Sequence, residues 1–96
     1  MLDWLEDWYL SMCDGDWEHN YGITIETLDN PGWDLTIDLV NTGIELKDEK
    51  WNLIEESENN WYGYKITNNV FNAAGDPKKL NFLISLFRER ISLPSS

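Results

Sequence analysis

The sequence predicts an α+β fold: an antiparallel meander sheet of about four strands, with an N-terminal and a C-terminal helix packed on one face. Two observations predict this class. Apolar residues recur at helical spacing near both ends of the chain, whereas in between they alternate with polar residues at the two-residue period of strands. Because 96 residues suffice for one hydrophobic core, we expect a single domain over residues 1–96.

An amphipathic helix is predicted at the N-terminus, because apolar side chains there recur every three or four residues. The predicted apolar stripe is Leu2, Leu5, Tyr9 and Met12, with Trp4 and Trp8 beside it. Acidic residues gather toward the start of this segment, where the helix dipole favours negative charge. The helix is expected to stop at Asp14–Gly15, since a glycine just after the periodic residues is a stop signal.

A β-hairpin is predicted over residues 23–40, with a Pro-Gly turn at Asp29–Gly32. Burying the apolar residues of both strands on one face determines the register, because a slip of one residue would turn one set outward. The expected pairs are Ile23 with Leu39, Ile25 with Ile37 and Thr27 with Leu35. The opposite face then carries Glu26, diagonal to both Asp34 and Asp38.

Two more strands are predicted after the hairpin. One lies around Ile44–Glu56, which contains a charged break, and the other is Trp61–Thr67, where large apolar residues alternate with smaller and polar ones. The segment around Asn72–Gly75 is predicted to be a loop.

The C-terminal helix is predicted to have Asp76 as its N-cap and Pro77 in its first position. Its expected apolar face consists of Leu80, Leu83, Ile84, Phe87 and Ile91. Pro94 is expected to end it, because proline cannot continue a helix.

Acidic residues outnumber basic ones by 18 to 7, which gives a net charge of −11. The whole excess lies in Met1–Leu46, which holds 11 acidic residues and no Lys or Arg. Direct nucleic-acid binding is therefore not expected, because phosphate contacts need a basic surface. The sequence shows no apolar run long enough to cross a membrane, no start typical of a secreted protein, and a single cysteine. These features favour a soluble, cytoplasmic protein.

Three carboxylates share the outward face of the predicted hairpin. Glu26, Asp34 and Asp38 have no basic residue in either strand to offset them. They repel one another on an exposed sheet, and a basic partner would turn that repulsion into attraction. The alternative is a solvated acidic face that only keeps the protein soluble.

The segment Cys13–His19 contains several kinds of metal ligand and one Cys-His pair. Its spacing matches neither a calcium-binding loop nor a zinc site, which usually pairs Cys or His residues. The segment contains the residue types of a Cys-His nucleophilic site or of a catalytic pair of acids. The spacing does not indicate that these groups are aligned for catalysis. We therefore expect a polar loop between helix and strand, with no metal, no cofactor and no catalysis.

Six tryptophans and four tyrosines could form a stacking platform, so an aromatic-rich carbohydrate or small-ligand binding module is the alternative function. Most of these rings are expected in the core. Trp33 and Trp51 lie on predicted apolar faces, whereas Trp17 and Trp61 lie beside polar loops and are expected to be partly exposed.

The runs Cys13–Ile23 and Thr27–Trp33 resemble the immunity protein 53 family of bacterial polymorphic toxin systems. The resemblance implies a small cytoplasmic protein, without catalysis of its own, that binds and neutralises a cognate toxin. Such toxins are frequently nucleases, and a nuclease needs a basic surface that an acidic inhibitor can occupy. We therefore expect stoichiometric occlusion of the toxin's active site or substrate groove.

The residues expected to bind this partner fall in the hairpin face and in the loop that carries the first run. They are Asp14, Asp16, Trp17, Glu18, Glu26, Asp34 and Asp38. The turn Asp29–Trp33 is more readily explained by the fold, because glycine suits a turn and a tryptophan suits the core. The sequence leaves the oligomeric state open.

Overall fold

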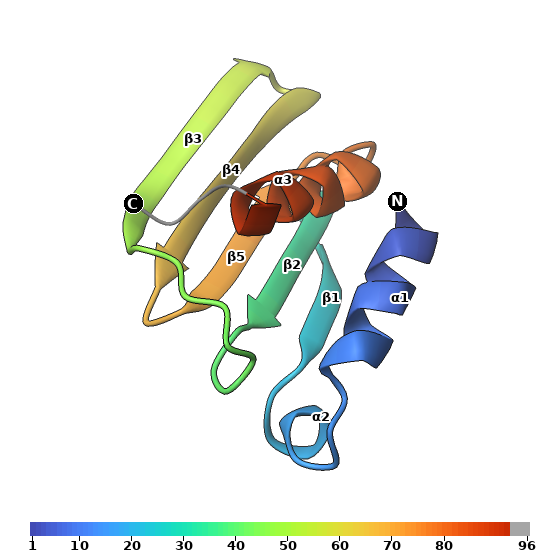
Figure 1. Ribbon diagram of the computed structural model, residues 1–96. Helices are drawn as coiled ribbons and strands as arrows, with labels where there is room; N and C mark the ends of the chain where they lie inside the picture. The colour runs from blue at the N-terminus through green and yellow to red at the C-terminus, as the bar shows by residue number, and fades with distance from the viewer. Residues whose placement is uncertain (93–96) are drawn as a thin grey trace.

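The computed structural model describes residues 1–92 and contains one five-stranded antiparallel sheet (Figure 1). The elements are α1 Leu2–Met12, α2 Trp17–Asn20, β1 Ile23–Leu28, β2 Gly32–Asp38, β3 Glu49–Ser57, β4 Asn60–Thr67, β5 Val70–Gly75 and α3 Leu80–Ser92. The strands lie in the order β1-β2-β5-β4-β3. The α+β class and the two terminal helices are thus confirmed. Pro94 lies outside the described residues.

The prediction of about four strands in a simple meander is wrong, because the segment predicted as a loop forms the central strand β5. This strand pairs with both β2 and β4. It buries Phe71 and Ala73 completely. Its small and polar residues have weak strand propensity, but neighbours on both sides supply the backbone hydrogen bonds that propensity alone does not predict.

The connection from β2 to β3 passes across one end of the sheet and is tied to the β4–β5 turn by Asn69. The Asn69 Nδ2 group donates to the carbonyl oxygens of Ile44 at 2.7 Å and Leu39 at 3.3 Å. Its Oδ1 atom accepts the Leu46 N–H at 2.9 Å. Asn69 has a positive φ of 64°, which asparagine tolerates better than most residues. Together with the Asn68 N–H, which donates to Asp48 Oδ1 at 3.0 Å, this side chain holds the connection that leads to β3 at the sheet edge.

The β1–β2 hairpin has the predicted faces but not the predicted register. Ile23 pairs with Ile37 and Ile25 with Leu35, a displacement of two residues from the expected pairs. The turn contains only Asp29–Pro31, so Gly32 already belongs to β2. An even displacement leaves each side chain on its predicted face, because strand side chains alternate.

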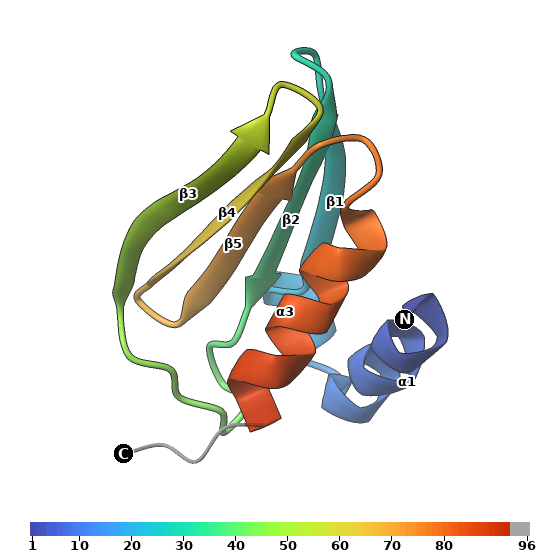
Figure 2. The ribbon, with the colours of Figure 1, turned by 90° about the horizontal axis from the view of Figure 1, so that it is seen from above.

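Both α1 and α3 pack on the same face of the sheet (Figure 2). From α3, Leu83, Ile84 and Phe87 are fully buried against the sheet. The Trp8 ring of α1 meets the Phe87 ring edge-on, with 4.9 Å between ring centroids. These two helices and the inner side chains of the sheet form the hydrophobic core.

The apolar stripe of α1 differs from the predicted one. Leu5 and Trp8 are buried, whereas Leu2 and Tyr9 are 53% and 39% exposed. The reason is that α1 turns its tryptophan side toward α3, where aromatic rings fill more space than leucine would.

The predicted N-cap of α3 is wrong by several residues, because α3 begins at Leu80. Asp76 instead organises the turn before the helix. Its Oδ1 atom accepts the Lys78 N–H at 2.9 Å, and its Oδ2 atom accepts the Trp61 N–H at 3.0 Å and the Lys79 ammonium at 2.8 Å. A carboxylate that serves donors from both β4 and the turn links the sheet to the start of α3.

Candidate functional site

No helix of residues 1–92 covers the sheet on the side opposite α1 and α3 (Figure 2). We call this side the open face. The side chains on it that matter below are Glu26, Asp34, Thr36, Asp38, Asn72, Trp51, Leu53, Glu55 and Trp61. The open face therefore combines an acidic half on β1 and β2 with an aromatic half on β3 and β4.

The hairpin register places two of the predicted binding residues directly opposite each other. Glu26 pairs with Asp34, whereas the prediction placed them on a diagonal. Asp38 lies at the far end of β2, and its Oδ1 atom accepts the Val40 N–H at 3.0 Å. The three carboxylates thus share one face, as expected, but only Glu26 and Asp34 are immediate neighbours.

Neutral donors hold Asp34 without cancelling its charge. The Asn72 Nδ2 group donates to Asp34 Oδ1 at 3.1 Å and to Thr36 Oγ1 at 2.9 Å, and the Thr36 hydroxyl donates to Asp34 Oδ2 at 3.3 Å. Within residues 1–92, ion pairs join Lys79 with Asp76 and Arg90 with Glu49. Neither ion pair includes a carboxylate of the acidic half, and the nearest basic residue on the open face by strand pairing is Lys65 of β4, opposite Asn72.

The carboxylates of the α2 loop bind the loop's own backbone. Asp14 Oδ1 accepts the N–H groups of Asp16 and Trp17 at 2.9 and 3.0 Å. The Glu18 carboxylate accepts those of Asp14 and Gly15 at 3.0 and 2.8 Å. Hydrogen bonds from backbone N–H groups lower the pKa of both carboxyls. The largest contribution comes from the Trp17 N–H for Asp14 and from the residue's own N–H for Glu18. These contacts give both residues a structural role in the loop.

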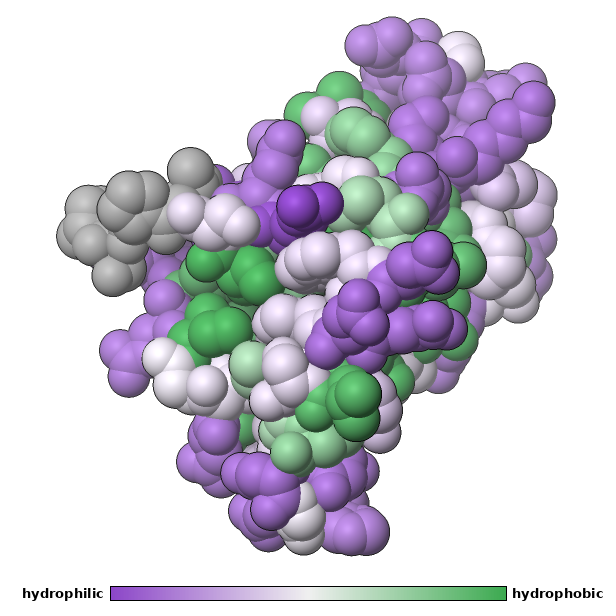
Figure 3. Space-filling view, turned by 45° about the vertical axis from the view of Figure 1, so that its right-hand side comes forward, coloured by the Kyte–Doolittle hydropathy of each residue, from purple (hydrophilic) through white to green (hydrophobic). Residues whose placement is uncertain are grey.

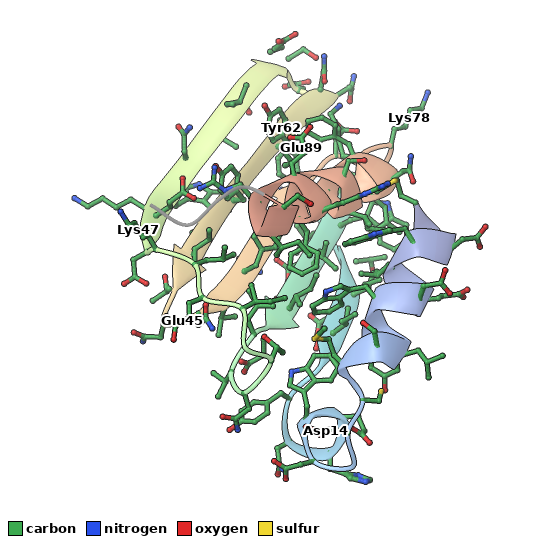
Figure 4. The ribbon with its side chains drawn as sticks, in the orientation of Figure 1. Asp14, Glu45, Lys47, Tyr62, Lys78 and Glu89 are labelled. Carbon is green, nitrogen blue, oxygen red and sulfur yellow. The ribbon has the colours of Figure 1, made fainter. Side chains whose placement is uncertain are left out.

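The prediction that Trp17 is partly exposed is wrong, because this side chain is fully buried. Its indole N–H donates to the Asp38 carbonyl oxygen at 3.0 Å, and its ring meets the Trp8 ring edge-on at 5.8 Å. Trp17 therefore attaches the α2 loop to the end of β2, so the two predicted groups of binding residues meet at Asp38. Figure 4 shows Asp14 in this loop, at the opposite end of the molecule from Lys78.

The aromatic half of the open face contains a groove of about 560 Å³. The residues that line it include Trp51, Leu53, Glu55, Glu58, Trp61 and Pro77. Partial exposure of Trp61 was predicted and is confirmed. The placement of Trp51 in the core was wrong, because it is 44% exposed.

Sequence reasoning missed this groove because of a change of register within β3. Glu49 faces α3 and contacts its Arg90, but the pairing with β4 shifts between Glu49 and Asn52. A bulge of this kind reverses which residues face outward, so the alternation before it does not predict the alternation after it. The charged break in this segment was the one available signal.

The Cys13 and His19 side chains, considered above as metal ligands or as a catalytic pair, form no hydrogen bond with each other. The Cys13 thiol donates to the Tyr9 carbonyl oxygen at 3.3 Å, and His19 is exposed. Among residues 1–92, no group of three or more His, Cys, Asp or Glu side chains is placed to hold a metal ion. In the same part of the chain, no helix is long and apolar enough to cross a membrane.

The opposite side of the molecule offers fewer features of a binding surface. On the side where α1 lies, hydrophobic side chains reach the surface in small areas between hydrophilic ones (Figure 3). On α1, Leu2, Tyr9 and Leu10 are exposed. Exposed apolar side chains are common on the surfaces of soluble proteins. The open face, where charge and exposed tryptophans lie together, is therefore the best candidate site.

Tryptophan side chains on an uncovered sheet face are a feature of surfaces that bind other proteins, because aromatic residues are enriched in such interfaces. The family model of immunity protein 53 matches residues 2–92, and the chain belongs to this family. The resemblance found in the two sequence runs is thus confirmed. Immunity proteins bind a cognate toxin and are generally not enzymes. Comparisons with curated proteins and with solved structures gave no match.

Proposed function

We propose that this protein binds its cognate toxin through the open face and neutralises it by covering the toxin's active site or substrate groove. The observation that carries the proposal is the pair Glu26 and Asp34, two adjacent carboxylates without a basic partner on an uncovered sheet. The toxin that fits such a face has a basic surface, as a nuclease does. In this proposal, the protein binds its toxin in the cytoplasm of the producing cell.

The distribution of charge supports this choice of face. All 11 acidic residues of Met1–Leu46 stay outside the ion pairs found within residues 1–92. A basic toxin would be drawn toward this half of the molecule, because long-range attraction between opposite charges speeds association. Electrostatic attraction therefore makes association with a basic toxin fast and selective.

The acidic residues of the α2 loop contribute to the charge around the binding face and are not assigned direct contact with the toxin. Asp16 is exposed and accepts a hydrogen bond from the Asn20 side chain at 2.9 Å, and with Asp14 and Glu18 it extends the negative surface past Asp38. Trp17 contributes by packing, because a buried indole offers no surface to a partner. Direct contact is assigned to Glu26 and its neighbour Asp34, and to Asp38 at the far end of β2.

Combining Glu26→Lys with Asp38→Asn is expected to slow association with the toxin by about tenfold or more at low salt. Asparagine keeps an oxygen that can accept the Val40 N–H, so the end of β2 stays intact. The toxin is recovered first by pull-down from the native host with the tagged protein. Association rates are then measured by stopped-flow at several salt concentrations.

The matched control combines Glu6→Lys with Asp7→Asn on α1, which changes the net charge equally on the other side of the molecule. We expect this control to associate nearly as fast as the unchanged protein. Equal slowing by both variants would show that only net charge matters, and an unchanged rate for the folded open-face variant would refute this face as the binding site.

A further inference from the structure

The groove on the aromatic half of the open face is built around two tryptophan rings that lie over glycines. A methyl group placed on Gly63 would be 2.7 Å from Trp51 Cζ2, and one on Gly32 would be 3.2 Å from Trp61 Cζ2. A larger residue at Gly63 would push the Trp51 ring away, whereas one at Gly32 would first meet the Gly75 carbonyl oxygen at 2.5 Å and then the Trp61 ring. The rings are thus supported from below by the sheet, while the groove leaves part of each open to solvent.

Carboxylates supply the charge around these rings. Glu55 lies opposite Trp61 in the β3–β4 pairing, and Glu58 lies in the turn that joins the two strands. Both are exposed and line the groove. No Lys or Arg of residues 1–92 lines it, and the nearby Lys79 ammonium is held by Asp76 and Asn60 at 2.8 and 2.7 Å.

We infer that this groove binds an arginine side chain of the protein partner, with the guanidinium group stacked on Trp51 and Trp61 and paired with Glu55 and Glu58. The inference rests on the proposed function, because the basic toxin is the partner that carries the arginine. The acidic half of the open face then attracts the toxin, and the groove anchors one residue of it.

The chemistry of the groove selects arginine over other occupants. A guanidinium group is planar, so it stacks on an indole and can present two N–H donors to a carboxylate at the same time. A cation over an aromatic ring gains further from the negative ring face. An anionic ligand would be repelled by the two glutamates, and a neutral sugar would use the rings but not the charges.

The test uses the intact protein labelled with ¹⁵N and the peptide acetyl-Gly-Arg-Gly-amide at millimolar concentration. The indole N–H signals of Trp51 and Trp61, assigned with the Trp51→Phe and Trp61→Phe variants, are expected to shift in NMR spectra. Those of Trp8 and Trp17, which are buried in the core, are expected to stay in place. The citrulline peptide, which has the same shape without the charge, is expected to bind about fivefold more weakly.

Combining Glu55→Gln with Glu58→Gln provides the matched variant, because it removes the charges and keeps the size of both side chains. It is expected to bind the arginine peptide no better than the unchanged protein binds the citrulline peptide. Unmoved Trp8 and Trp17 signals in the free variant show that the fold is intact.

Three results would overturn the inference: no shift with the arginine peptide, equal shifts with the citrulline peptide, or shifts of the same two signals by a neutral oligosaccharide alone. The last would assign the groove to sugars. Because no toxin enters this experiment, a failure here would leave the proposed function standing if the Glu26 variant still slows toxin association. Conversely, if the Glu26 variant does not slow toxin association, the peptide experiment can still show that the groove binds arginine.

Discussion

Replacement of Trp17 by alanine is expected to lower the free energy of unfolding by about 3–5 kcal/mol. The ring is fully buried and packs edge-on against Trp8, so its removal opens a cavity between α1 and the α2 loop. It also leaves the Asp38 carbonyl oxygen without the indole N–H. A loss of this size is a large part of the roughly 5–15 kcal/mol that holds a domain together. Urea unfolding followed by circular dichroism measures it.

The matched control is Trp51→Ala, the same substitution at a ring that is 44% exposed. We expect it to cost about 1 kcal/mol, because less surface leaves water when this ring packs. Similar losses for both variants would contradict the packing role of Trp17.

Trp17→Phe separates packing from partner contact. Phenylalanine retains most of the buried ring but cannot donate the hydrogen bond to the Asp38 carbonyl oxygen. The variant is expected to stay folded and to bind the toxin nearly as well as the unchanged protein. A folded variant with greatly weakened binding would return Trp17 to the interface, where the sequence had placed it.

The faces of the hairpin could be predicted from sequence because alternation is a local property. Glu26 and Asp34 lie on the face opposite Ile25 and Leu35, as the alternation of apolar residues indicates. The pairing itself could not be predicted, since it depends on how many residues form the turn. The expected pairs leave Gly32 and Trp33 unpaired next to the turn, whereas both residues pair with β1, so every expected pair is displaced by two residues.

The features that sequence reasoning missed depend on contacts between distant segments. β5 exists as a strand because β2 and β4 lie on either side of it. Trp51 faces outward because the pairing of β3 with β4 shifts by one residue. The sequence of β3 alone does not indicate this shift. The aromatic half of the candidate site was therefore hidden, whereas the acidic half was visible in the local pattern.

Asp76 connects the stability of the fold to the geometry of the groove. Its side chain is 1% exposed and accepts the N–H of Trp61, whose ring lines the groove, and of Lys78, the residue after Pro77. Asp76→Asn is expected to cost about 2–3 kcal/mol, because the amide replaces an accepting oxygen with a donor and cannot satisfy the same three groups. The loss is measured by urea unfolding near neutral pH.

The control for this variant is Asp29→Asn, which removes an equal charge from an exposed position in the β1–β2 turn. It is expected to change the free energy of unfolding by less than about 0.5 kcal/mol. If Asp76→Asn were equally mild, the carboxylate would not hold the turn before α3.

The stabilisation by Asp76 is expected to depend on pH in one window. Burial alone would raise the pKa of this carboxyl, but hydrogen bonds from the Lys79 ammonium and from the Lys78 and Trp61 N–H groups lower it from 3.8 to about 2. Because the folded protein holds the proton less tightly than the unfolded chain, the stabilisation is complete above the unfolded-state value of 3.8 and is lost as the pH falls through about 2. The difference in unfolding free energy between the unchanged protein and Asp76→Asn should therefore shrink between about pH 5 and pH 2. A difference that stays constant across this range would mean that the charge of Asp76 contributes nothing, and that only its shape holds Trp61 at the groove.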